Sequence, residues 1–113
     1  MTKVGEGEKV PKPTVEQYHK DVDASSLKFL NALGSYNNGE GLTSEEKSHL
    51  KVIMDQQLEI IRAAVKELKR AGIYKQEVKV ENDYKEYMNK GTPESFAALE
   101  HDLTTLRDYN QLP

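Results

Sequence analysis

Several side chains that build reactive or metal-bound sites are missing or rare in this chain. There is no cysteine, which excludes disulfide bonds, cysteine-ligated zinc and a thiol nucleophile. There is no tryptophan, and the three histidines lie far apart, at His19, His49 and His101. Metal or acid–base chemistry would therefore depend on few positions.

Long apolar runs and a positive charge balance are also missing. No run of about 18 apolar residues occurs, so the sequence predicts no membrane-spanning helix. Met1–Pro13 lacks the apolar core of a secretion signal, and we expect a soluble, cytoplasmic protein, with non-classical export left open. The net charge is −3 and no basic stripe stands out, which argues against nucleic-acid binding. The expected partner is neither a membrane nor a nucleic acid.

The length and the first residues indicate a single domain behind a tail. At 113 residues the chain can bury one modest core. Residues 1–13 mix glycine and proline with lysine and glutamate, too few apolar groups to offset the entropy lost on ordering. We therefore expect a flexible tail over 1–13 and one domain over 14–113.

The longest apolar stripe lies between Thr43 and Gly72. Thr43 and Glu46 form the pattern of a capping box, and Gly72 can adopt the left-handed conformation that ends a helix. On a helical projection the apolar side chains fall within an arc of roughly 160°. They are Leu50, Ile53, Met54, Leu58, Ile60, Ile61, Ala64, Val65 and Leu68. So wide an arc predicts a helix packed against two neighbours, with Gln57 as a buried, hydrogen-bonded amide.

Two further helices are marked by caps and periodic apolar residues. Thr14 is placed to cap a helix that extends to about Tyr36. The pair Thr92 and Pro93 is typical of a helix start, and apolar residues at heptad spacing extend that last helix to about Tyr109. Both helices are amphipathic, which suits packing against the central one.

The segment after Gly72 is less regular. Valines alternate with charged residues over 73–81, and because no second strand is available for pairing we expect an extended connector. Asp83 can then cap a short helix that Gly91 ends. The predicted fold is all-α: a small antiparallel bundle of three main helices plus one short helix.

No catalytic, cofactor or metal site is predicted. His19 and Asp23 lie one turn apart, but two ligands do not define a metal site. The Glu-x-x-His spacing of di-metal bundles occurs at Glu16 and again at Glu46, yet Glu16 is off the core face and Glu46 is a capping residue. The glycine-containing turn before Thr43 does not match the ligand spacing of a calcium loop. We expect no enzyme, and a metal-binding bundle is kept as an alternative.

Partner contact is the function that the remaining features favour. Leu27 falls outside the apolar stripe of its helix, and Tyr74, Tyr84 and Tyr87 gather around the irregular connector. Tyrosine is favoured at interfaces because its ring buries area while its hydroxyl keeps a hydrogen bond. The alternative is that these tyrosines close one end of the bundle.

We therefore predict a small acidic interaction module of bacterial type, such as an adaptor, chaperone, immunity protein or secreted effector, without catalysis of its own. A second hypothesis is a homodimer through the seam of the last helix, which comprises Phe96, Leu99, Leu103 and Leu106. Packing against two neighbouring helices would cover the apolar stripe of the central helix. Function should therefore lie on the tail, the turn Asn37–Leu42 or the segment after Gly72.

Overall fold

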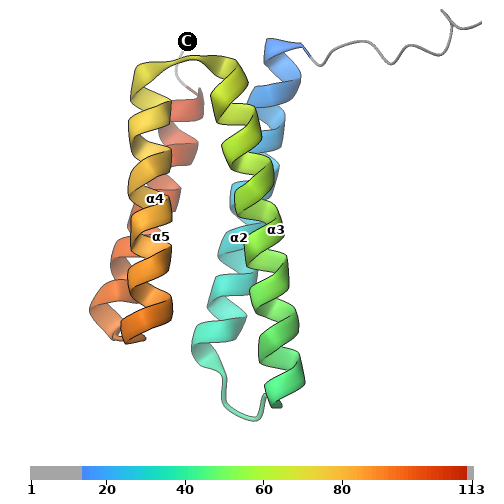
Figure 1. The fold of residues 1–113 in the computed structure, drawn as a ribbon, viewed down its shortest axis with the longest axis vertical. Coiled ribbons are helices and arrows are strands. Elements are labelled where there is room, and N and C mark those ends of the chain that lie inside the picture. The colour runs from blue at the N-terminus through green and yellow to red at the C-terminus, as the bar shows by residue number, and fades with distance from the viewer. Residues whose placement is uncertain (1–13, 112–113) are drawn as a thin grey trace, which may run out of the picture.

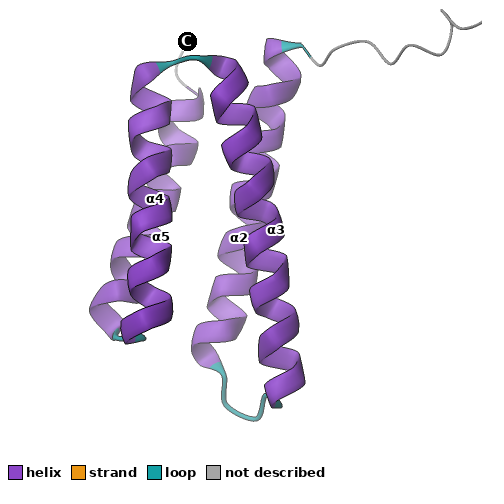
Figure 2. Cartoon of the chain, viewed as in Figure 1, coloured by secondary structure: helices purple, strands orange, loops and turns teal. Residues whose placement is uncertain are grey.

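The computed structural model describes residues 14–111, which form four helices and no strand within that range. They are α2 (Val15–Asn38), α3 (Ser44–Leu68), α4 (Ala71–Lys90) and α5 (Pro93–Gln111). Consecutive helices are antiparallel and joined by short turns, which makes a small all-α bundle (Figures 1 and 2). The fold class predicted from the sequence is confirmed. The predicted flexible tail lies outside the described residues.

The caps found in the sequence begin the first two helices. Thr14 accepts a hydrogen bond from the backbone N–H of Gln17 at 3.1 Å. At α3 the Thr43 hydroxyl accepts from the Glu46 N–H at 3.0 Å, and Glu46 accepts from the Thr43 N–H at 2.8 Å. Each bond satisfies a backbone donor that the helix itself leaves free. The predicted capping box at the start of α3 is confirmed.

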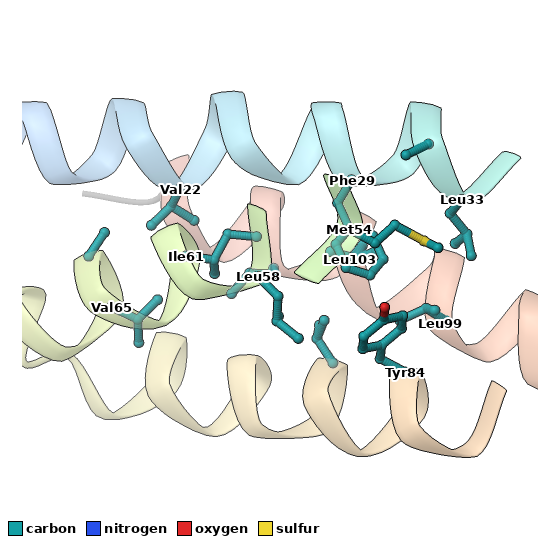
Figure 3. Packing of buried hydrophobic residues seen from close by; sticks show 14 of the residues in the cluster. Val22, Phe29, Leu33, Met54, Leu58, Ile61, Val65, Tyr84, Leu99 and Leu103 are labelled. Atoms are coloured by element: carbon teal, nitrogen blue, oxygen red, sulfur yellow. The ribbon is translucent and has the colours of Figure 1, made fainter. Parts of the chain in front are cut away.

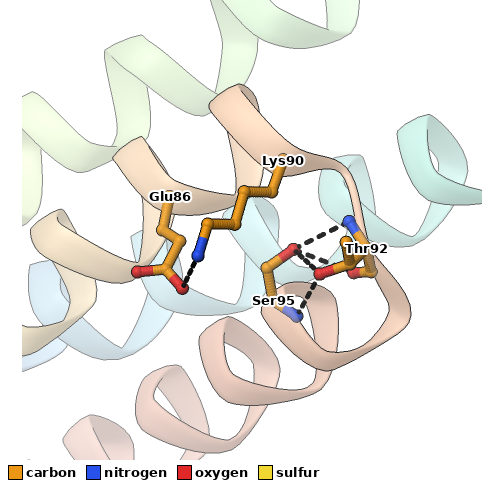
Figure 4. A network of polar contacts seen from close by, with 4 residues as sticks. All are labelled: Glu86, Lys90, Thr92 and Ser95. Carbon is orange, nitrogen blue, oxygen red and sulfur yellow. Dashed lines mark hydrogen bonds and ion pairs between the residues drawn. The ribbon is translucent and has the colours of Figure 1, made fainter.

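The turn between α4 and α5 also follows the prediction. Gly91 ends α4 with a positive φ of 61°, a conformation that glycine adopts without steric cost. Thr92 then caps α5: its hydroxyl accepts from the Ser95 N–H at 3.1 Å, while the Ser95 hydroxyl accepts from the Thr92 N–H at 3.0 Å. Figure 4 shows this reciprocal pair beside the ion pair of Glu86 and Lys90.

The extended connector predicted for 73–81 is wrong, because α4 is continuous from Ala71 to Lys90. Its buried positions follow a helical period of three and four residues, namely Ile73, Gln76, Glu77, Val80, Tyr84 and Tyr87. Two of these are polar, so the apolar pattern alone did not reveal the helix. The bundle has four main helices instead of three plus a short one.

The predicted end of the central helix at Gly72 is also wrong. α3 stops at Leu68, and Lys69 takes the left-handed conformation with φ of 55°. Gly72 instead lies in the first turn of α4, which has no side-chain cap at its start. Two residues, Lys69 and Arg70, therefore form the whole connection between α3 and α4.

All four helices contribute to one core, part of which Figure 3 shows. Its fully buried side chains include Val22 and Phe29 of α2, Met54 and Ile61 of α3, and Val80 of α4. From α5, Leu99, Leu103 and Leu106 are fully buried and Phe96 packs against the core. A homodimer through these α5 residues would have to replace contacts made within the chain.

Gln57 departs from its predicted role. Its side chain is half-buried, and Gln57 Oε1 is enclosed without a hydrogen-bond partner among the described residues. None of the described residues supplies the predicted hydrogen bond to this oxygen.

The two hairpins of the bundle differ in length. α2 and α3 have 24 and 25 residues, whereas α4 and α5 have 20 and 19. The closed end of the α2–α3 hairpin consequently extends past the ends of α4 and α5 (Figure 1). Of the neighbouring helix pairs, α3 and α4 contact each other least. The surface is hollowed at both of these places.

Two adjacent isoleucines test the orientation of α3 in the core. Ile61 is fully buried and Ile60 is 43% exposed. We expect Ile61→Ala to lower the free energy of unfolding by about 2 to 5 kcal/mol, because it removes buried methylene groups and leaves a cavity. Ile60→Ala, the matched control, should change it by less than about 1 kcal/mol. Urea unfolding followed by circular dichroism measures both, and equal losses would contradict this orientation.

Candidate functional site

The four residues predicted to bind a partner do not form one surface. Leu27 of α2 is 45% exposed and Tyr74 of α4 is 57% exposed. Tyr84 and Tyr87 are only 7% and 4% exposed and belong to the core. Leu27 and Tyr74 thus stay candidates for partner contact, while the other two have the alternative role, that of packing within the bundle.

Tyr87 packs among aromatic rings where α2 and α4 end. Its ring lies 6.2 Å from that of Tyr36 and 6.1 Å from that of Phe96, and its hydroxyl donates to Asn37 Oδ1 at 2.9 Å. Burial raises the pKa of Tyr87, and the nearby Tyr36 adds to this. The residue is therefore a neutral hydrogen-bond donor inside the bundle.

Tyr84 connects the core to the rim of the α3–α4 interface. Its ring meets Phe29 edge-on at 5.2 Å, and its hydroxyl donates to Asp55 Oδ1 at 2.6 Å. Burial and the bond to Asp55 raise the pKa of Tyr84. Burial alone would raise the pKa of Asp55, but hydrogen bonds from Tyr84 and Lys51, with the lysine charge, lower it overall. Asp55 is thus a fixed anion at this rim.

A hollow of about 280 Å³ lies between α3 and α4 above Tyr84. Its lining residues are Asp55, Leu58, Glu59, Arg62, Glu81, Tyr84 and Lys85. Arg62 crosses the interface and donates to both oxygens of Glu81, from Nε at 3.1 Å and from Nη2 at 2.9 Å. This two-point bond raises the pKa of Arg62 and lowers that of Glu81. Charged side chains therefore make up most of the lining of the hollow.

Glu77, one turn before Glu81, is the most deeply buried acid among the described residues that show a resolved pKa shift. The residue is 2% exposed, and its Oε2 has no hydrogen-bond partner within 14–111. Burial, followed by the hydrogen bond and charge of Glu81, raises the pKa of Glu77 to about 8, against the opposing charge of Arg62. At neutral pH the Glu77 carboxyl therefore holds its proton, and Glu81 is the ionised member of the pair.

The interface between α2 and α5 is also polar on its outer side. His19 Nδ1 lies 2.7 Å from Asn110 Oδ1, and Asn110 Nδ2 donates to the His19 carbonyl at 2.8 Å. Arg107 donates to Asp23 at 2.9 Å. His19 and Asp23, considered as two metal ligands from the sequence, are thus each engaged by α5. Over residues 14–111 no three or more histidine or acidic side chains gather in a way that could hold a metal ion.

The most apolar groove lies on the outer side of the α2–α3 hairpin. A hollow of about 450 Å³ at the closed end is lined by Ser35, Leu42, Glu45, Glu46, His49 and Leu50. A second hollow of about 320 Å³ adjoins it and is lined by Lys28, Asn31, Ala32, Ser35, Leu50 and Ile53. Since both share Ser35 and Leu50, they form one track, which we call the α2–α3 groove.

Charge is distributed unequally along the α2–α3 groove. Glu45 and Glu46 line its closed end, at the start of α3, while Lys28 lines the opposite end. Leu27 precedes Lys28 in α2 and lies one helical turn from Asn31, which also lines the groove. The turn Asn37–Leu42, singled out from the sequence, contributes Leu42 to the wall. Sequence reasoning missed the other lining residues, because they come together only when α2 and α3 pair.

Comparisons with models of protein families, with curated proteins and with solved structures find no match to this chain. Among the helices described between residues 14 and 111, none combines the length and apolar character needed to cross a lipid bilayer.

The bond between Tyr84 and Asp55 can be tested by removing one hydroxyl. Tyr84→Phe should lower the free energy of unfolding by about 1 to 2 kcal/mol, because a hydrogen bond to an ionised carboxylate is lost. The pKa of Asp55 should rise towards its ordinary value, which a carboxyl NMR titration measures. Tyr74→Phe, at an exposed ring, should leave the stability within about 0.5 kcal/mol of the wild type. An unchanged Asp55 pKa in the Tyr84 variant would contradict the bond.

Proposed function

We propose that this chain is a protein-binding module of the adaptor type, without catalysis of its own, and that it receives a segment of its partner in the α2–α3 groove. One observation carries the proposal: two adjoining hollows follow the hairpin for roughly two helical turns and continue to its closed end, beyond α4 and α5. Each hollow is open to solvent, and its volume falls within the range of protein binding sites.

The lining indicates the chemistry of the segment. Leu50 lines both hollows, Leu42 lines the one at the closed end, and Ala32 and Ile53 line the other; these aliphatic side chains suit an apolar anchor from a partner. The acidic pair Glu45 and Glu46 favours lysine or arginine at one end of that segment. An amphipathic helix with an aliphatic stripe and a basic end fits this description, as in other helix-in-groove complexes.

Leu27 can extend the contact at the other end of the groove. It lies next to Lys28, and its exposed side chain is an aliphatic surface that a bound helix could cover. Tyr74 belongs to α4 and does not line the groove. The proposal therefore keeps Leu27 as a partner contact and does not use the tyrosines.

A photoreactive amino acid placed in the groove tests whether a partner is bound there. Ser35 is exposed and shared by both hollows, so a crosslinker at this position should give a discrete protein adduct in cells that contain the partner. The same crosslinker at Gln56, exposed on α3 away from the groove lining, is the matched control. Equal adducts from both positions would contradict a groove-specific interaction.

With the captured partner purified, two pairs of variants measure the groove directly. Leu42→Ala and Glu45→Lys should each weaken binding by about tenfold, because one removes an apolar contact and the other reverses a charge. Ile60→Ala and Glu67→Lys make the same changes on α3 outside the groove and should leave the affinity unchanged. Isothermal titration calorimetry gives the affinities, and thermal unfolding confirms that each variant is folded. Unaltered binding by both groove variants would rule out this site.

A further inference from the structure

Two pairs of acidic side chains, one within α4 and one between α4 and α5, are not explained by the α2–α3 groove. One pair, Glu77 and Glu81, lies toward α3, and the other joins Asp83 of α4 to Asp102 of α5. Each pair includes a carboxyl oxygen that is buried without a hydrogen-bond partner in the described part of the chain, Glu77 Oε2 and Asp83 Oδ2. Two carboxylates at close range repel each other unless they share a proton.

At the α3 side Arg62 is the cation that acts on both acids, and Lys85 acts on Glu81 as well. Arg62 places its two donors on Glu81, so that Glu77 is left with the weaker, indirect attraction of the same guanidinium. The charged groups acting on Glu77 are thus Arg62 of α3 and Glu81 of its own helix, while Glu59 of α3 acts on Arg62. The buried carboxyl of Glu77 is neutral only while it holds its proton. An ionised carboxylate without a cation of its own would be strongly disfavoured in this buried position.

The α5 side repeats this arrangement with different partners. Burial raises the pKa of Asp83 to about 7, and the hydrogen bond and charge of Asp102 and the charge of Glu86 add to this, with Lys79 opposing. Gln76 donates to the Asp102 carbonyl at 2.9 Å and reaches its Oδ1 at 3.4 Å. This amide holds Asp102 in place and donates nothing to Asp83 Oδ2, which is buried without a hydrogen-bond partner among residues 14–111.

We propose that α4 is a proton-responsive helix: one proton in each carboxyl pair holds it against α3 and α5, and loss of these protons loosens it from the bundle. The arrangement around α4 favours local opening. α4 has no side-chain cap at its start, is joined to α3 by two residues, and shares with α3 the least extensive contact and an existing hollow. Within residues 14–111, neither α2 nor α3 has a buried carboxyl oxygen that lacks a hydrogen-bond partner, so we expect the α2–α3 hairpin to stay folded when α4 loosens.

The direction of the response follows from proton linkage. The ordinary pKa values are 4.5 for Glu77 and 3.8 for Asp83, and in the folded chain they are about 8 and about 7. Between the ordinary and the folded pKa values, the folded state therefore binds more protons than the unfolded state. The free energy of unfolding falls as the pH rises through this range. The stabilisation that the two protonated acids give the folded state is complete below their ordinary pKa values and is lost above about pH 8.

Glutamine and asparagine imitate the protonated acids and test the proposal in the full chain. For the wild type, the unfolding equilibrium constant should rise at least about tenfold between about pH 6 and pH 9, since one unit of pKa shift corresponds to tenfold. Glu77→Gln should reduce this rise, and the double variant with Asp83→Asn should nearly abolish it. Glu100→Gln, an exposed acid on α5, is the matched control and should keep the wild-type rise. A Glu77→Gln variant with the wild-type pH dependence would overturn the proposal.

Two measurements on the wild type need no variant. In a carbon-13 NMR titration the side-chain carboxyl of Glu77 should titrate near pH 8, and titration below about pH 6 would overturn the proposal. Amide hydrogen exchange, corrected for the intrinsic effect of pH, should show α4 losing protection above pH 8 before α2 and α3 do. Simultaneous loss over all four helices would rule out local release of α4.

Discussion

Tyr84 joins three of the four helices and links the two hairpins at the interface where they touch least. Its ring packs against Phe29 of α2, and its hydroxyl donates to Asp55 of α3. A side chain with an apolar ring and a polar end can connect a core to a charged rim. With the ion pair of Arg62 and Glu81, it supplies the polar contacts between α3 and α4, where the helices touch least.

Three helices could be predicted because local signals and the apolar period agree in each, as at the capping box of Thr43. α4 could not, because two of its buried positions are occupied by Gln76 and Glu77. If Gln76 and Glu77 are taken as surface residues, Val78 and Val80 alternate with charged residues in the way typical of a β-strand. Burial of Glu77, which is 2% exposed, results from the tertiary packing of α4 and is not visible in a local pattern. Tertiary packing overrode the sequence preference here.

The errors about the site have the same origin as the error about α4. Composition indicates how many tyrosines are present, but only the helical phase of α4 places Tyr84 and Tyr87 inside and Tyr74 outside. The groove likewise needs the register of α2 against α3, since Ser35 and Leu50 become neighbours only after the hairpin closes. No spacing in the sequence encodes that pairing, although the turn that sets it was recognised.

The groove and the acidic pairs belong to different hairpins, and this separates the two proposals physically. Every residue that lines the groove comes from α2, α3 or the turn between them, which are also the helices with the most extensive contact. Loosening of α4 would expose the inner faces of α2 and α3 while leaving the outer groove intact. A partner bound in the groove would therefore stabilise the α2–α3 hairpin without opposing the release of α4. Loss of the protons would expose the inner faces of α2 and α3 and leave the affinity for that partner unchanged.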